Sequence, residues 1–180
     1  MNAETTATNL LLTGRPGIGK TTAVQRLVEL EPQLRLVGFL TVEVREQGQR
    51  VGFAAVTLAG ERLVIAHRDL ESAHRVGRYG VDADAIDRAV ELSLGSTATA
   101  DGFVVDEIGK MELFSVRFVT AMRRILDDSR PLVATIARRG GGFIAETPRR
   151  HDVETWQVNA TNRDRVPRRA AEWLRERLAR

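Results

Sequence analysis

The sequence predicts an α/β fold in which helices cover a mostly parallel β-sheet that carries an inserted antiparallel meander. Short apolar runs alternate with segments of helical periodicity along most of the chain, which is typical of βα units. The apolar run 9–13 leads through a glycine-rich loop into a helix, and the run 102–107 ends in two acidic residues. Between them, alternating polar and apolar residues over 35–67 predict the meander.

The glycine-rich loop fits G-x-x-x-x-G-K-[ST], the Walker A pattern that holds phosphate in P-loop proteins. In this chain the pattern is Gly14-Arg15-Pro16-Gly17-Ile18-Gly19-Lys20-Thr21. The glycines let the backbone approach an anion closely, and the amides from Gly17 to Thr22 can point inward as an anion nest. Pro16 has no N–H to offer and shapes the start of the loop. Lys20 supplies a cation for the β- and γ-phosphates, and the Thr21 hydroxyl is suited to Mg²⁺.

The segments on either side of the loop supply the context that the motif needs. Asn9–Thr13 fits a buried strand. After the loop, apolar residues recur at helical spacing until Pro32, at Ala23, Val24, Leu27 and Val28. The start of this helix adds its partial positive charge to the phosphate site. We therefore expect a P-loop NTPase three-layer sandwich of the RecA-like (ASCE) type, formed as a single domain over residues 1–180.

Composition excludes several classes of site and partner. The 180 residues include no cysteine, which excludes disulfides, thiolate metal sites and cysteine nucleophiles. No apolar run reaches the length of a membrane span, and Met1–Thr8 has no secretory pattern, so we expect a cytoplasmic protein without a membrane partner. The net charge is only +3, with interleaved acidic residues and 5% aromatics, so a nucleic-acid partner is not indicated.

Lysine usage singles out two positions. Of 27 basic residues only Lys20 and Lys110 are lysine, and arginine is used everywhere else. An ammonium group is smaller than a guanidinium and presents its donors differently. Lys20 belongs to the loop motif, and Lys110 follows the acidic strand end. We infer that both positions require the smaller cation.

Three strands form the expected meander. They cover Arg35–Arg45, Arg50–Leu58 and Arg62–His67. One face of the first strand is polar because Thr41, Glu43 and Arg45 alternate with apolar residues. Two interpretations stay open: this face is solvated, or Glu43 or Arg45 acts near the phosphates. Residues 67–80 are expected to be irregular.

The rest of the chain alternates helices and strands. Asp82 is the expected N-cap of a helix. The later elements are a helix over Ser115–Asp128, strands over Leu132–Ile136 and Glu154–Val158, and a closing helix over Asn162–Arg180. Between them, residues 138–150 contain three consecutive glycines and four arginines. This segment is either a mobile basic flap or a solvated loop.

The apolar strand Gly102–Glu107 supplies the second half of the expected site. A strand that ends in an aspartate is the Walker B element, which holds Mg²⁺, usually through a water. Asp106 takes that position. Glu107 beside it can orient and polarise a water in line with the γ-phosphate, which hydrolysis needs and binding alone does not. Thr135, at the end of the next strand, is a further residue that we expect to face the γ-phosphate.

The segment Val104–Ser115, which reads VVDEIGKMELFS, resembles the signature of a small P-loop nucleoside-triphosphatase family. That family includes the human cancer-related nucleoside triphosphatase. The segments Gly38–Arg45, Arg50–Phe53 and Val158–Asp164 resemble it too. The resemblance implies slow Mg²⁺-dependent hydrolysis of ATP, GTP and other nucleoside triphosphates, with little base preference, by a small and often monomeric protein.

The resemblance also implies roles for further residues. It puts Gly109 and Lys110 near the phosphates or in the loop that positions Glu107, and it puts Asn162 and Arg163 at the base pocket. The chain departs from the family pattern over 136–139, which reads Ile-Ala-Arg-Arg where relatives have proline and lysine. The role of the loop that follows is therefore open.

Three functions remain to be weighed. The leading interpretation is a nucleoside-triphosphatase in which Glu107 orients the attacking water. The second is a small-molecule or nucleotide kinase that uses residues 138–150 as a lid. The third is a nucleotide switch or RNA-associated module that uses the arginines of the last helix. A guanine-selective switch is disfavoured because no N-K-x-D reader is present. Candidate arginine fingers are Arg45, Arg78, Arg138, Arg139 and Arg163.

The lysine pattern generates a test. Lys110→Arg keeps the charge but changes the size and geometry of the head group. We expect phosphate release to fall by about tenfold to 100-fold, the cost of a small misplacement in a catalytic site. A steady-state phosphate-release assay measures this, and an unchanged rate would refute the inference from lysine usage.

Overall fold

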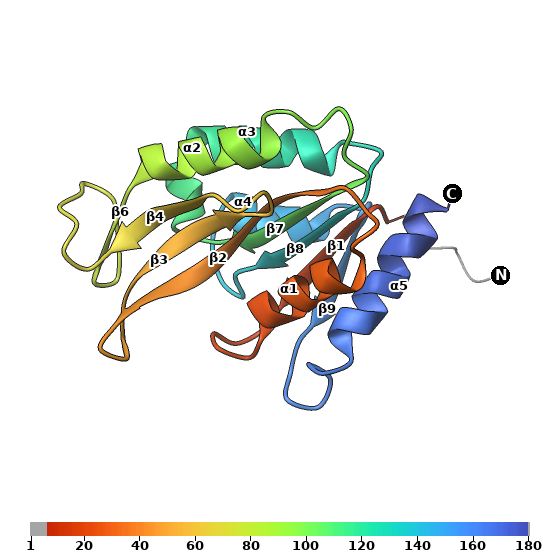
Figure 1. The fold of residues 1–180 in the computed structure, drawn as a ribbon, viewed down its shortest axis with the longest axis horizontal. Coiled ribbons are helices and arrows are strands. Elements are labelled where there is room, and N and C mark those ends of the chain that lie inside the picture. The colour runs from red at the N-terminus through yellow and green to blue at the C-terminus, as the bar shows by residue number, and fades with distance from the viewer. Residues whose placement is uncertain (1–6, 180) are drawn as a thin grey trace.

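The computed structural model describes residues 7–179, which form one sheet with helices on both faces (Figure 1). Residues 1–6, part of the segment without a secretory pattern, and Arg180 lie outside this description. The strands follow the order β5-β6-β4-β3-β2-β7-β8-β1-β9. Their bounds are β1 Asn9–Thr13, β2 Leu36–Glu46, β3 Gln49–Thr57, β4 Arg62–His67, β5 Arg75–Val76, β6 Tyr79–Val81, β7 Gly102–Ile108, β8 Leu132–Ile136 and β9 Val153–Gln157.

The sheet has a parallel half and an antiparallel half. Strands β2, β7, β8, β1 and β9 pair in parallel, and β3, β4, β6 and β5 continue from β2 as antiparallel neighbours. β8 lies between β7 and β1, so one strand separates the two phosphate motifs. The predicted α/β fold with a parallel core and an inserted meander is confirmed.

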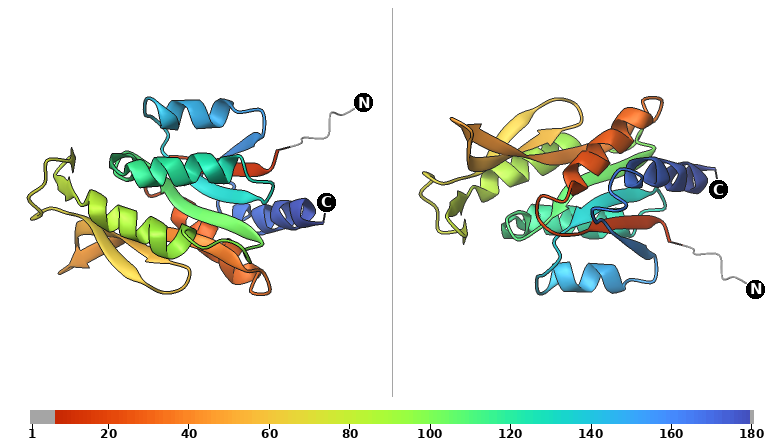
Figure 2. Two further views of the ribbon diagram at one scale, coloured as in Figure 1. Left: turned by 90° about the horizontal axis from the view of Figure 1, so that it is seen from above. Right: turned by 90° about the horizontal axis from the view of Figure 1, so that it is seen from below.

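The helices form the two outer layers. Their bounds are α1 Lys20–Leu30, α2 Ala83–Leu94, α3 Val116–Leu126, α4 Phe143–Glu146 and α5 Val166–Leu178, with short 3-10 turns η1 Glu112–Phe114 and η2 Thr147–Arg149. Helices α2 and α3 cover one face of the sheet, and α1 and α5 cover the other (Figures 1 and 2). None of the helices over residues 7–179 combines the length and apolar character that a membrane crossing needs.

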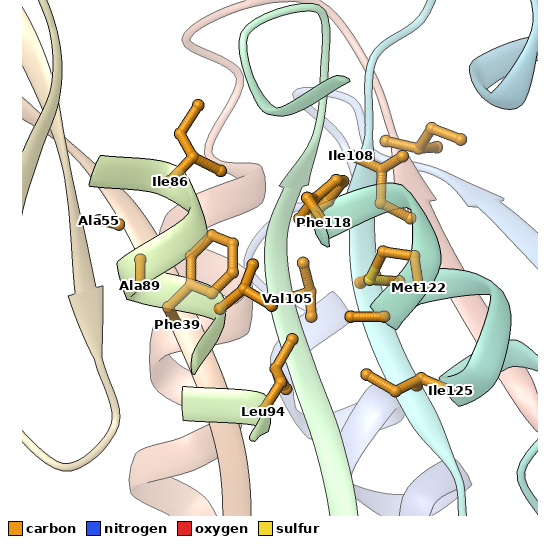
Figure 3. Packing of buried hydrophobic residues seen from close by; sticks show 14 of the residues in the cluster. Phe39, Ala55, Ile86, Ala89, Leu94, Val105, Ile108, Phe118, Met122 and Ile125 are labelled. Atoms are coloured by element: carbon orange, nitrogen blue, oxygen red, sulfur yellow. The ribbon is translucent and has the colours of Figure 1, made fainter. Parts of the chain in front are cut away.

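Each face of the sheet has its own apolar core. Under α2 and α3, Phe39 of β2 and Phe118 of α3 lie 6.2 Å apart between ring centroids, with Val105 of β7 in the same cluster (Figure 3). Under α1 and α5, Leu10 and Leu12 of β1 are fully buried in a second cluster. Burying one large apolar side chain stabilises a fold by about 1.5–3 kcal/mol. The two cores therefore hold the parallel strand ends in place.

Capping side chains explain where two helices begin. The Asp82 carboxylate accepts a hydrogen bond from the Ala85 amide at 2.9 Å and starts α2, as the sequence predicts. The Ser115 hydroxyl accepts from the Phe118 amide at 2.8 Å and starts α3. Each cap satisfies an amide that the first turn of a helix leaves without an intrahelical partner.

Residues 67–80, expected to be irregular, contain two short strands. β5 and β6 form a hairpin around Gly77, whose positive φ of 58° suits a tight turn. β6 also pairs with β4, where Ala66 is opposite Val81. The prediction was wrong because these strands are too short for their periodicity to show, and only the neighbouring strand gives them partners.

Two further boundaries differ from the sequence prediction. Residues 138–150 were expected to be a flap or loop, but Phe143 and Ile144 of α4 are buried against the sheet. Helix α5 starts at Val166 rather than at Asn162. The Asn162 side chain instead binds main-chain groups of Gln157 and Asn159 and closes a turn. Local polar contacts of this kind compete with helix formation.

Gly38 generates a stability prediction. It pairs with Val104, has a φ of 136°, and an added Cβ would lie 1.7 Å from the Val104 carbonyl oxygen. Gly38→Ala should lower the free energy of unfolding by about 3 kcal/mol or more, because backbone atoms cannot move aside cheaply. Urea unfolding followed by tryptophan fluorescence measures the change. Gly141→Ala, which meets nothing within 4 Å, is the matched control and should change it by about 0.5 kcal/mol at most.

Candidate active site

A cavity of about 920 Å³ opens at the carboxyl ends of the parallel strands. It is lined by the loop between β1 and α1, by β2 and β3, by the segment from Asp106 to Glu112, and by residues 137–139 after β8. Ligands of open α/β sheets bind at this edge. A second cavity, of about 710 Å³, lies between α1 and α5 and contains none of the phosphate-loop residues.

The phosphate loop has the backbone shape that its sequence predicts. Gly17 and Gly19 have positive φ angles of 74° and 107°, a conformation that other residues adopt only with strain. Gly14 lies so close to the neighbouring segment that an added Cβ would be 2.6 Å from the Val158 carbonyl oxygen. Helix α1 begins directly at Lys20, so its N-terminal amides and partial positive charge face the loop.

Lys20 lies beneath the loop and is only 8% exposed. Its ammonium group donates to the Gly14 carbonyl oxygen at 3.4 Å and lies 3.9 Å from the Glu107 carboxylate. A buried cation with one carbonyl and one distant carboxylate retains donors for an incoming anion. The position is suited to holding phosphate oxygens between the loop and Glu107.

Asp106 is fully buried and is the best-connected polar group of the site. One carboxylate oxygen accepts a short hydrogen bond from the Thr135 hydroxyl, and the other accepts from the Thr41 amide at 3.3 Å. The Thr21 side chain lies near enough to lower the pKa of Asp106. Burial raises the pKa of Asp106, and these hydrogen bonds together with the Lys20 charge oppose that rise. The structure thus brings Thr21, Thr135 and Asp106 together.

Glu107 lies beside Asp106 and faces the cavity. Burial raises the pKa of Glu107, the Lys20 charge lowers it, and the Asp106 charge raises it again. A carboxylate whose pKa is above its ordinary value is a better proton acceptor near neutral pH than a solvated one. Glu107 thus lines the cavity with its carboxylate 3.9 Å from the Lys20 ammonium group.

The residues present fit a magnesium ion. Within residues 7–179 no group of three His, Asp or Glu side chains could hold a metal ion. Mg²⁺ does not need such a group, because it keeps several waters and binds one or two protein oxygens plus substrate phosphates. The Thr21 hydroxyl and the Asp106 carboxylate are oxygen ligands of that type, and both line the cavity.

Glu112 is a site residue that sequence reasoning missed. It is 3% exposed, lines the cavity, and has its pKa raised to about 8, mainly by burial and further by the charges of Glu107 and Asp106. A Cβ on Gly109 would lie 2.8 Å from a Glu112 oxygen and 3.3 Å from a Glu107 oxygen. Gly109 therefore keeps the two carboxyl groups close to one another. The sequence did contain a signal for this burial, because Glu112 stands between the apolar residues Met111 and Leu113.

The other predicted residues divide into two groups. Those that line the cavity with the phosphate loop are Pro16, Thr22, Gly109, Lys110, Arg138 and Arg139. Four of the other predicted residues do not line it. Arg15 is exposed, and Ile18 packs against the α1–α5 core. Asn162 and Arg163 follow β9. Among the candidate arginine fingers, Arg45 is ion-paired with Glu43 at 2.6 Å and Arg78 donates to the Arg50 carbonyl oxygen.

The buried Glu112 makes stability depend on pH. Its pKa of about 8 in the folded protein is above its ordinary value of 4.5, so the folded state favours the protonated form. The stability that this preference contributes is complete below pH 4.5 and is lost as the pH rises through 8.

Glu112→Gln, which stays neutral, should have about the same stability as the parent protein at pH 5. At pH 9 it should be more stable by several kcal/mol, at about 1.4 kcal/mol per unit of pKa. Urea unfolding at the two pH values measures the difference. The exposed Glu71→Gln is the matched control, and a Glu112 variant that behaves like it would contradict the assignment.

Comparison with known proteins identifies the family. A family model described as NTPase matches residues 9–171. Nucleoside-triphosphatase THEP1 of Natranaerobius thermophilus is 40% identical over 177 residues, which cover 96% of this chain and 99% of that protein. Nucleoside-triphosphatase THEP1 of Thermotoga sp. (strain RQ2) is 39% identical over 159 residues, covering 86% and 88%.

Two solved structures have the same architecture. The crystal structure of THEP1 from the hyperthermophile Aquifex aeolicus matches with a TM-score of 0.77 at 32% identity, over 92% of this chain and 98% of that one. The solution structure of a human cancer-related nucleoside triphosphatase matches with a TM-score of 0.80 at 34% identity, over 94% and 98%. With its phosphate loop, paired acids and nearly complete coverage by the family model, this chain belongs to the NTPase family.

Proposed function

We propose that this protein is a Mg²⁺-dependent nucleoside-triphosphatase that hydrolyses ATP, GTP and other nucleoside triphosphates to the diphosphate and phosphate. The observation that carries the proposal is the Glu107 carboxylate, 3.9 Å from the buried Lys20 ammonium and adjacent to the buried Asp106. A nucleotide-binding protein without hydrolysis has no need of this second acid. The family relationship supports the same activity.

The binding roles follow from the loop geometry. The amides of Gly17 to Thr22 and the Lys20 ammonium hold the β- and γ-phosphates. Thr21 and Asp106 would hold Mg²⁺, since both supply oxygen ligands, and the hydrogen bonds from Thr41 and Thr135 fix the orientation of the Asp106 carboxylate. When bound, Mg²⁺ supplies positive charge that neutralises the phosphate oxygens. Thr135 is fully buried and does not line the cavity, and its hydroxyl keeps the Asp106 side chain oriented.

Glu107 supplies the chemistry of the attacking water. The water oxygen attacks the γ-phosphorus as one water proton moves to the Glu107 carboxylate, and the bond from the γ-phosphorus to the β–γ bridging oxygen breaks. The diphosphate leaves with that oxygen. The raised pKa of Glu107 matches this role, because a general base works best when its pKa approaches the working pH.

Arg138 and Arg139 are the arginines best situated to act in cis. Both line the cavity at the end of β8, both are exposed, and neither forms an ion pair within residues 7–179. They stand where the family pattern has other residues. An exposed arginine has to move before it can neutralise transition-state charge, which fits the slow turnover that the family resemblance implies. Asn162 and Arg163 remain predicted contacts of the base.

The two alternative functions have less support. A kinase lid over residues 138–150 would have to detach, yet Phe143, Ile144 and Thr147 in that segment are buried. The nucleic-acid interpretation rests on exposed arginines of α5, which lie outside the phosphate cavity. Transfer to an added acceptor would favour the kinase, and binding that falls steeply with salt would favour the nucleic-acid module.

Phosphate release from ATP, GTP, CTP and UTP, with Mg²⁺ and with EDTA, tests the proposal. We expect all four to be hydrolysed, with rates within about tenfold of one another, because the cavity carries no guanine reader and discrimination of a few kcal/mol needs buried polar contacts. With EDTA release should stop. Hydrolysis of only one nucleotide would refute the broad specificity, and release that ignores EDTA would refute the magnesium site.

Glu107→Gln tests the base directly. The variant should bind Mg²⁺ and a nucleoside triphosphate as before, while phosphate release falls by about 100-fold to 10,000-fold, because an amide cannot accept the water proton. Fluorescent-nucleotide binding and phosphate release are measured on the same preparation. Glu71→Gln, a change of the same kind on the surface, should leave both unchanged. A Glu107 variant with near-normal turnover would end the assignment.

A further inference from the structure

The cavity extends well beyond the residues that hydrolysis uses. Its other part, called the outer half below, is lined by Glu43, Arg50, Phe53, Val76, Tyr79 and Met111. These residues come from β2, β3, the β5–β6 hairpin and the start of η1, on the antiparallel side of the sheet (Figure 1). A total volume of about 920 Å³ is near the upper end for small-molecule sites. Attack by a water molecule does not require this extension.

The outer half lies beyond the γ-phosphate rather than along the nucleoside. The Thr41 amide holds Asp106, and Glu43 is two residues further along the same face of β2, about 7 Å away at the rise of a strand. Glu43 pairs with Phe53 on β3. The acids mark the γ end of a bound triphosphate, and the nucleoside is attached at the other end. A ligand in the outer half is therefore a second molecule.

The wall of the outer half is suited to a flat ring. Phe53 and Tyr79 meet edge to face, with ring centroids 5.3 Å apart and planes at 76°. The Arg50 guanidinium lies 5.2 Å from the Phe53 centroid and 5.9 Å from the Tyr79 centroid. Val76 and Met111 add apolar surface. Aromatic rings and a guanidinium plane are the groups on which planar ligands stack.

The charges of the outer half are suited to an anion. Glu43 is the carboxylate shared by Arg45 at 2.6 Å and Arg50 at 3.0 Å. Arg50 and Arg78 both donate to the Tyr79 hydroxyl at 3.1 Å. Arg78 does not line the cavity, and it has no carboxylate partner within residues 7–179. The side chain of Arg50 is 43% exposed and that of Glu43 is 38% exposed. A ligand anion can reach Arg50 and compete with Glu43 for it.

One buried atom between the two halves has no partner. The Thr41 hydroxyl oxygen is buried and makes no hydrogen bond to any described residue, although Thr41 lines the cavity. Leaving a buried hydroxyl unpaired costs about 1–3 kcal/mol. A polar ligand atom or a water at this junction would supply the missing partner.

We propose that the outer half binds a second small molecule, one with a flat ring and a phosphate group, as in a nucleoside monophosphate. The ring lies against Phe53 and Tyr79, and the phosphate pairs with Arg50. The proposal rests on the proposed function in one respect only: Asp106 and Glu107 are assumed to mark the γ-phosphate end of the bound triphosphate. It assigns the meander a ligand-binding role that hydrolysis alone does not give it.

Calorimetry on the protein saturated with Mg²⁺ and a non-hydrolysable ATP analogue tests this. AMP is then titrated, followed in separate runs by adenosine and inorganic phosphate. We expect one equivalent of AMP to bind, and each of the two fragments to bind at least about tenfold more weakly, because ring and anion contacts contribute together. Failure of the analogue to bind in the first step would count against the proposed function, and that result is separate from the AMP result.

Variants separate the site from a general charge effect. Arg50→Ala should weaken AMP binding by about tenfold or more, and Glu43→Gln should strengthen it several-fold by releasing Arg50. A gain of affinity cannot result from misfolding. Arg62→Ala, which removes an exposed arginine of β4 outside the cavity, is the matched control. The proposal is overturned if AMP binds only when the analogue is absent, or if Arg50→Ala and Arg62→Ala behave alike.

Discussion

The hydrogen bonds to Asp106 are the contacts on which the rest of the site depends. This carboxylate, at the end of β7, accepts from the amide of Thr41 in β2 and from the hydroxyl of Thr135 in β8, and Thr21 of α1 lies near enough to lower its pKa. Four elements that are distant in the sequence are thereby held at one point. A buried carboxylate without these donors would be strongly destabilising, so the fold and the phosphate site specify each other. The two apolar cores then fix the strands that carry the donors.

The site concentrates acids around a single buried ammonium group. Asp106, Glu107 and Glu112 all have pKa values raised by burial, and Lys20 is the cation that lowers the first two. Such an arrangement is unfavourable for the protein alone, and strained or poorly compensated groups are typical of functional sites. A bound Mg²⁺ ion would add compensating positive charge beside Asp106. Ligand binding and stability are consequently linked in this protein.

The antiparallel half of the sheet changes what the cavity can hold. In the parallel half the strand ends provide a phosphate loop and two acids, the parts to which we assign hydrolysis. The meander and the β5–β6 hairpin add an aromatic wall and the Arg50 guanidinium to the same cavity. The polar face of β2 joins the two halves, since Thr41 contacts Asp106 and Glu43 contacts Arg50. Relatives with the same architecture offer a direct comparison for this surface.

Short-range patterns in the sequence determined the phosphate loop, the acidic strand end, the capped helices and the parallel core. Glycine spacing, apolar periodicity and capping residues each act over a few neighbouring residues, so they can be read without the fold. Features that depend on partners distant in the sequence were decided only by the tertiary structure. β5 and β6 exist because β4 offers them a neighbour, and Phe143 is buried although its segment reads as a loop. Glu112 became a site residue only when folding buried it beside Glu107. Burial and the charges brought near a group are properties of the packed chain, so no local pattern could reveal them.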